Sequence, residues 1–90
     1  MSFRKLQGVS LTEEQQGLIR YTCLNYDGQS KKIQKKIQRL CDEVGGAYSA
    51  ALWDVMCTKK SITYIAQKHF ISESELYRKR KKFYESWGGQ

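Results

Sequence analysis

Residues 61–87, SITYIAQKHFISESELYRKRKKFYESW, decide how this chain folds, because they hold two segments of helical pattern separated by a short joint. The first segment follows Ser61, a candidate N-cap, and has apolar residues at helical spacing. The second begins at Ser72, and Glu75 three residues later makes a capping box, in which each side chain bonds the backbone of the other residue. A basic run with interspersed aromatics, YRKRKKFY, fills the second segment. The stretch therefore predicts two consecutive helices, the second of them basic.

The joint between these segments has the spacing of a helix-turn-helix. Such a motif needs a small residue where the helices cross, apolar residues in the angle between them, and a capped second helix. Ala66 occupies the crossing position, with Ile65 before it. Ile71 follows the turn, and Leu76 packs back from the first turn of the second helix. The spacing predicts a helix-turn-helix at about residues 61–87.

The segment YIAQKHFISESELYRKRKKF resembles the helix-turn-helix of sigma-factor region 4 and of small phage regulators. With the preceding KKIQRLCDEVGGAYSAALWDVMCTKKS, the arrangement is similar to the ArpU/RinA-type phage activators of late transcription. The specific part of the resemblance covers about the last third of the chain. It implies a DNA-binding regulator of phage or mobile-element origin, with RNA polymerase as a further partner.

Some positions depart from the pattern of these families. Phe70 stands where the turn usually has glycine, so it must avoid a positive φ or accept strain. His69 occupies the apolar position before it, and Lys79 stands where the second helix often has its next apolar residue. Phe83 would then have to provide that packing. These departures bear on the angle at which the helices cross.

The fold class expected for the whole chain is all-α, a small single-domain bundle of about five helices with a C-terminal helix-turn-helix. A chain of 90 residues has room for one hydrophobic core, and it contains no proline and no strand pattern. Residues 1–10 are expected to form a flexible arm, and residues 11–90 a single helical domain.

Upstream of residue 61 the helix limits have clear signals. Thr12 and Gln15 make a capping box for a first helix, which Asp27-Gly28 ends. Gly45-Gly46 ends a second, strongly amphipathic helix. The residues expected to face inward are Leu18, Ile19, Thr22 and Tyr26 in the first helix, Ile33, Ile37, Leu40, Cys41 and Val44 in the second, and Tyr48, Ala51, Leu52, Val55 and Met56 in the third.

A net charge of +7 and a pI near 9.5 favour an anionic partner, nucleic acid first and an acidic membrane surface or acidic protein second. A mean hydropathy of −0.67 argues against a membrane span. The basic residues near the N-terminus have no hydrophobic segment behind them, so we expect no secretory signal and a cytoplasmic protein.

Nothing in the sequence points to catalysis. Cys23, Cys41 and Cys57 stand far apart and are expected to be reduced core residues. His69 is the only histidine, so a metal site is not expected. The acidic residues show no acid/base spacing, and we expect no enzyme activity and no cofactor.

The outward positions of the basic helix that begins at Ser72 are candidates for contacts in the major groove of DNA. Arg78 is the best of them, because its guanidinium matches guanine O6 and N7. Glu73 either accepts a hydrogen bond from cytosine or serves only as a first-turn helix residue. The base-reading candidates are Ser72, Glu73, Ser74, Tyr77, Arg78 and Lys81. The phosphate-contact candidates are Lys59, Lys60, Lys68, Lys79, Arg80 and Lys82, together with Lys31, Lys32 and Lys35 on the amphipathic helix, for which a solvated helix face is an equal alternative.

The leading interpretation is a sequence-specific transcriptional regulator that binds double-stranded DNA. A DNA-packaging protein resembling a small terminase subunit, or a recombination accessory protein such as an excisionase, uses the same kind of domain. From a different class, an adaptor without a nucleic-acid role would dock an acidic protein through exposed Trp53, Tyr84 and Trp87. RNA binding is a variant of the leading interpretation, and a homodimer stays open because no heptad pattern commits the chain to one.

Overall fold

The structure, a computed structural model, describes residues 12–88. In chain order its helices are α1 (Glu13–Leu24), α2 (Lys31–Gly45), α3 (Ser49–Cys57), α4 (Ile62–His69) and α5 (Glu73–Gly88), with short 3-10 turns η1 (Tyr26–Gly28) and η2 (Gly46–Tyr48). No strand occurs among these residues, so the predicted all-α fold class is confirmed. The predicted arm, residues 1–10, lies outside the described residues. Between residues 12 and 88 no helix has both the length and the apolar character needed to cross a lipid bilayer.

Local signals set the helix limits. The predicted capping box at α1 is present: the Gln15 N–H donates to Thr12 Oγ1 at 3.1 Å, and the Thr12 N–H donates to Gln15 Oε1 at 2.9 Å. Ser61 caps α4 as predicted, accepting a backbone N–H at 3.1 Å. At the end of α2, Gly46 has a φ of 56°, which glycine adopts without strain.

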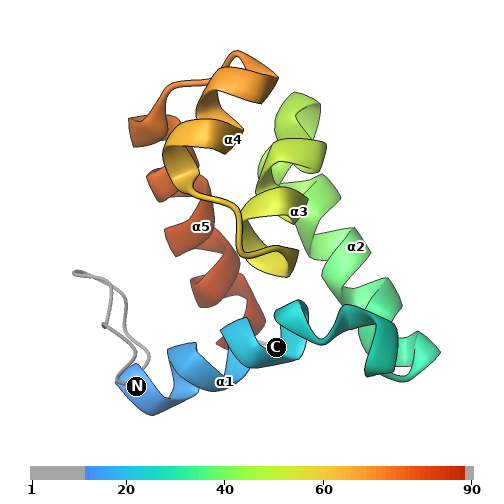
Figure 1. Cartoon of the computed structure of the whole chain (residues 1–90). Helices are drawn as coiled ribbons and strands as arrows, with labels where there is room; N and C mark the ends of the chain where they lie inside the picture. The colour runs from blue at the N-terminus through green and yellow to red at the C-terminus, as the bar shows by residue number, and fades with distance from the viewer. Residues whose placement is uncertain (1–11, 89–90) are drawn as a thin grey trace.

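α3 is the helix around which the others are arranged. It packs against α1, α2, α4 and α5, and Figure 1 shows it between α2 and α5. Its residues Ala51, Leu52, Val55 and Met56 are buried, as predicted. α1 crosses one end of the bundle, opposite the end where α4 turns into α5 (Figure 1).

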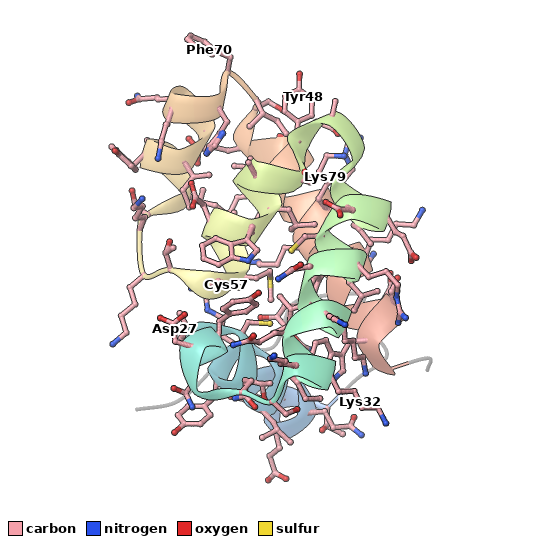
Figure 2. All side chains as sticks on the ribbon, turned by 90° about the vertical axis from the view of Figure 1, so that its right-hand side faces the viewer. Asp27, Lys32, Tyr48, Cys57, Phe70 and Lys79 are labelled. Carbon is pink, nitrogen blue, oxygen red and sulfur yellow. The ribbon has the colours of Figure 1, made fainter. Side chains whose placement is uncertain are left out.

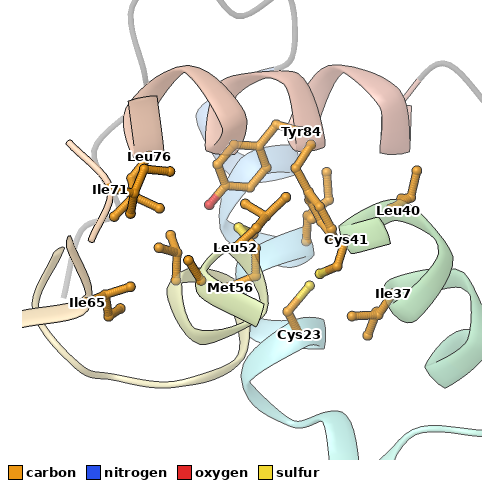
Figure 3. Close-up of a cluster of buried hydrophobic side chains, with 14 of the residues drawn as sticks. Cys23, Ile37, Leu40, Cys41, Leu52, Met56, Ile65, Ile71, Leu76 and Tyr84 are labelled. Atoms are coloured by element: carbon orange, nitrogen blue, oxygen red, sulfur yellow. The ribbon is translucent and has the colours of Figure 1, made fainter. Parts of the chain in front are cut away.

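One continuous core joins these helices. In Figure 3, Leu52 and Met56 of α3 lie beneath Tyr84 of α5. The buried apolar residues of the core are Ile19, Cys23, Ile37, Leu40, Cys41, Ala51, Leu52, Val55, Met56, Ile65, Ala66, Ile71, Leu76, Phe83 and Tyr84. The core therefore extends from α1 to the connection between α4 and α5.

Two predicted orientations are wrong. Leu18 is 66% exposed, because α1 turns Ile19 and Cys23, one helical turn apart, toward the core. Tyr48 is 40% exposed. It belongs to η2, before α3 begins, so the helical spacing of α3 does not extend to it.

Arg20, which the sequence did not single out, ties α1 to the end of α3. Its guanidinium donates to the carbonyl oxygen of Val55 and, at 3.1 Å, to that of Thr58. The last carbonyls of a helix have no partner within the helix, and a cation there also interacts favourably with the helix dipole. Arg20 thus satisfies the C-terminal end of the central helix.

We expect Arg20→Met to lower the free energy of unfolding by about 2 kcal/mol, because hydrogen bonds from a charged donor are lost and buried carbonyls are left without a partner. Urea denaturation followed by circular dichroism measures this. The matched control is Arg39→Met, which removes an exposed ion pair with Glu43 (3.8 Å) and should cost less than about 0.5 kcal/mol. Equal effects of the two substitutions would contradict the role given to Arg20.

The three cysteines have free thiols and meet where α1, α2 and α3 pack together. A hydrogen bond with the Cys57 thiol, together with burial, raises the pKa of Cys23 above its ordinary value. Burial raises the pKa of Cys41 to about 12. Both thiols therefore stay protonated at neutral pH and act as small core residues, in line with the sequence expectation.

In the native protein at pH 8 we expect iodoacetamide to alkylate Cys23 and Cys41 on the order of 1000-fold more slowly than a free cysteine, because the thiolate is the reacting form. Mass spectrometry of quenched samples measures the rates, with the urea-unfolded chain as the control. Fast labelling of Cys23 before unfolding would show that this packing is wrong.

Candidate nucleic-acid interface

The turn between α4 and α5 is closed by backbone hydrogen bonds. The Ile71 N–H donates to the Ala66 carbonyl at 3.0 Å, and the Phe70 N–H donates to the Gln67 carbonyl at 3.5 Å. These are the two bonds of a Schellman motif, which ends a helix with one residue in the left-handed region. That residue is Phe70, with φ 55° and ψ 44°. The chain thus accepts the strain, about 1–2 kcal/mol for a residue with a Cβ, where glycine would avoid it.

The inner side of this turn is apolar. Ile65, Ala66, Ile71 and Leu76, the residues predicted to fill the angle between the helices, are all buried. In Figure 3, Ile65, Ile71 and Leu76 lie together at one side of the core. We call residues 65–76 the α4–α5 corner. Its apolar side fixes the direction in which α5 leaves the turn.

An interaction with α3 anchors the corner. His69 Nε2 lies 2.8 Å from Asp54 Oδ2, and Lys68 Nζ lies 3.9 Å from the same oxygen. Asp54 is only 9% exposed and is the charged residue of an otherwise apolar α3. A single acidic residue in an apolar helix indicates that its carboxylate needs a partner. The sequence did not show that this partner would be His69.

We expect a double-mutant cycle with Asp54→Ala and His69→Ala to give a coupling energy of about 1 kcal/mol at neutral pH, since the two side chains share a short and mostly buried hydrogen bond. Urea denaturation of the four proteins measures it. A second cycle with Lys68→Ala is the control, because Lys68 is half exposed and should couple by less than about 0.5 kcal/mol. No coupling between Asp54 and His69 would contradict the anchor.

The outer side of α5 carries an exposed stripe that starts at the corner. The Ser72 hydroxyl accepts the Glu75 N–H at 3.1 Å and so caps the helix. Successive turns of α5 then present exposed side chains on the same side. The exposed stripe of α5 consists of Glu73, Ser74, Tyr77, Arg78, Lys82 and Glu85, with the partly exposed Lys81. All the predicted base-reading residues thus lie on this stripe or, for Ser72, directly before it.

Arg78, the principal candidate, is paired in the free protein. Its guanidinium contacts the Glu75 carboxylate one turn earlier, and Lys79 Nζ lies 4.0 Å from the other oxygen of that carboxylate. The Arg78 side chain is nevertheless 72% exposed. An exposed pair of this kind contributes little to stability, so Arg78 can exchange Glu75 for another partner at low cost.

Two predicted phosphate contacts, Lys79 and Arg80, are not among the residues of the stripe. The Lys79 side chain is 19% exposed, and its Nζ lies 6.0 Å from the centre of the Tyr48 ring. The Arg80 guanidinium lies 5.1 Å from the centre of the Tyr77 ring, and its Nε is buried without a hydrogen-bond partner in the described part of the chain. Burial also lowers the pKa of Arg80. Both residues lie toward the side of α5 that packs on the core, which argues against their predicted role.

The remaining lysine candidates divide into two groups. Lys59, Lys60 and Lys68 are exposed on or before α4, and Lys60 Nζ lies 5.9 Å from the Tyr64 ring centre. Lys31, Lys32 and Lys35 are exposed in the first turns of α2. Figure 2 shows Lys32 at the opposite end of the molecule from Phe70. The fold therefore separates the α2 lysines from the α4–α5 corner.

The aromatic anchors expected for an adaptor are largely occupied within the fold. Tyr84 is 1% exposed, because α5 packs against both α2 and α3, so it is not the exposed anchor that the adaptor interpretation requires. Trp53 is partly buried, and its ring packs edge-to-face with the Tyr26 ring, with the two ring centres 5.7 Å apart. Trp87 is partly buried, and the centre of its ring lies 4.1 Å from Lys36 Nζ.

Comparisons of the chain with protein-family models, with curated protein sequences and with solved structures found no match. The functional argument therefore depends on the chain's own geometry and charge.

Proposed function

We propose that this protein is a sequence-specific regulator that binds double-stranded DNA, with α4 and α5 as a helix-turn-helix and α5 in the major groove. The observation that carries the proposal is the exposed stripe of α5, which begins directly after a tight turn and contains Arg78 and Lys82. The major groove is wide enough for one α-helix, whose first turns reach the base edges. The net charge of +7 supports an anionic partner.

Arg78 is the residue we assign to direct base recognition. On binding it leaves Glu75 and donates two hydrogen bonds to O6 and N7 of a guanine, a geometry that its planar guanidinium matches. The contact with Glu75 limits the conformations of Arg78 before binding, which reduces the entropy lost on complex formation. Ser74 and Tyr77, on the same stripe, lie next to it for contacts with neighbouring bases or phosphates.

We assign the phosphate contacts to exposed lysines on α4, on α5 and in the segment before α4. Lys82 continues the stripe of α5, Lys68 adds an exposed positive charge on α4, and Lys60 adds one just before α4 begins. Such contacts position a protein on the duplex without selecting a sequence. The proposal gives no DNA contact to the lysines of α2, whose polar face needs no partner beyond water.

The biological role that we propose for DNA binding rests on the resemblance to sigma-factor region 4 and to phage activators. This resemblance favours transcriptional control, with RNA polymerase as a further partner. Packaging and recombination accessory proteins remain alternatives with the same interface. An adaptor without a nucleic-acid role has less support, because Tyr84 is buried and Trp53 and Trp87 are largely packed inside the fold.

Selection from random duplex DNA, followed by affinity measurements on the enriched site, tests the proposal. We expect Arg78→Ala to relax the preference at one base pair, at a cost of about 1–3 kcal/mol. Lys82→Ala should weaken binding to all sequences alike and reduce the slope of log affinity against log salt by about 1.

Lys32→Ala is the matched control for this experiment, since it removes the same charge at the end of the molecule opposite Phe70 and should leave the preference unchanged. If no sequence is enriched and Arg78→Ala behaves like Lys32→Ala, the protein does not read bases with α5.

A further inference from the structure

Phe70 is the most exposed of the large hydrophobic residues in residues 12–88, with 90% of its surface accessible. Figure 2 shows its ring projecting from the end of the molecule, beyond the turn that joins α4 to α5. A phenyl ring in this position is in contact with water rather than with the core. An isolated exposed hydrophobe is common on proteins, but this one is also held in an unfavourable backbone conformation.

The turn does not need the ring. Its closing bonds are made by the backbone N–H groups of Phe70 and Ile71, and the apolar side of the corner is filled by residues other than Phe70. Glycine at this position would make the same backbone bonds without the steric cost of a left-handed residue. Stability therefore favours glycine here, and the ring requires an explanation outside the folded chain.

The position of Phe70 indicates which partner it meets. It directly precedes Ile71 and Ser72, and α5 begins at Glu73 with its exposed stripe. Two residues before Phe70 in the sequence lies Lys68, an exposed cation. The ring is thus continuous with the surface to which we assign DNA binding, and that surface carries positive charge. The partner that fits both the position and the charge is the same DNA duplex.

We propose that Phe70 is a specificity-determining residue that contacts the C5-methyl group of a thymine at the edge of the bound site. The inference rests on the proposed function. A phenyl ring has no hydrogen-bonding group, so it cannot distinguish the donors and acceptors on base edges, and phosphate is a poor partner for it. The thymine methyl is the apolar group that the major groove presents.

Deoxyuridine substitution tests this contact, because it removes the methyl group and leaves the base pairing unchanged. On the enriched duplex, each thymine is replaced in turn, and the affinities of the wild type, Phe70→Gly and Phe70→Asn are measured. We expect one replacement to weaken the wild type by about 3- to 10-fold. Both variants should bind the thymine and uracil duplexes equally, at the weakened level.

The two variants separate the loss of the ring from any change in the turn. Glycine and asparagine both tolerate a left-handed backbone but differ in flexibility. The urea midpoint of Phe70→Gly should equal or exceed that of the wild type, so that its lower affinity does not result from unfolding. Tyr21→Ala, which removes a 65% exposed aromatic from α1 at the far end of the molecule, should keep the wild-type sensitivity to uracil.

Three results would overturn the inference while leaving the proposed function intact: a wild type indifferent to every uracil replacement, variants with wild-type affinity, or variants that are weaker but still sensitive to uracil. The second would point to a partner other than DNA, and the third to a contact with the sugar-phosphate backbone. A wild type that enriches no sequence would overturn the proposed function itself.

Discussion

The burial of α3 is the constraint on which the rest of this structure depends. α3 is short and mostly apolar, so it gains its stability by packing against α1, α2, α4 and α5. The polar groups of α3 find partners in residues distant in the chain. Arg20 donates to the carbonyls at the end of α3, and His69 pairs with Asp54, the single acidic residue of α3. The second contact also holds the end of α4, and through it the place where α5 begins.

The two sides of the α4–α5 corner differ in burial and in what their residues contact. Ile65, Ile71 and Leu76 on the inner side are buried and set the direction of α5. On the outer side, Phe70 accepts an unfavourable backbone conformation and exposes its ring. Just beyond the corner, Arg78 of α5 forms only a weak exposed pair with Glu75. Such features are expected at binding surfaces, where residues are kept for contacts that the free protein does not make.

Local interactions explain what could be predicted. Thr12, Ser61 and Ser72 cap their helices because a hydroxyl and a nearby backbone N–H meet within one turn, which the sequence shows directly. The exposed stripe of α5 also follows from helical spacing once its buried side is recognised by Leu76 and Phe83. The candidate base-reading residues belong to this predictable part.

Other features depend on how the helices are rotated against one another. Leu18 is exposed, Tyr84 is buried, and the Nε atom of Arg80 is buried. The helical spacing around each of these residues is also compatible with the opposite orientation. Helical periodicity gives the relative angles of side chains on one helix, but not which angle faces the neighbouring helices. The pairing of Asp54 with His69 and the position of Arg20 likewise require two helices to meet.

The sequence by itself determined the all-α class, the capped helix starts and the stripe of polar and basic residues on α5, because these depend on contacts within about one helical turn. Only the tertiary structure decided that Lys79 is largely buried, that Lys32 of α2 lies at the end of the molecule opposite Phe70, and that Phe70 projects beyond the turn. Those outcomes depend on packing around α3, which brings together residues far apart in the chain.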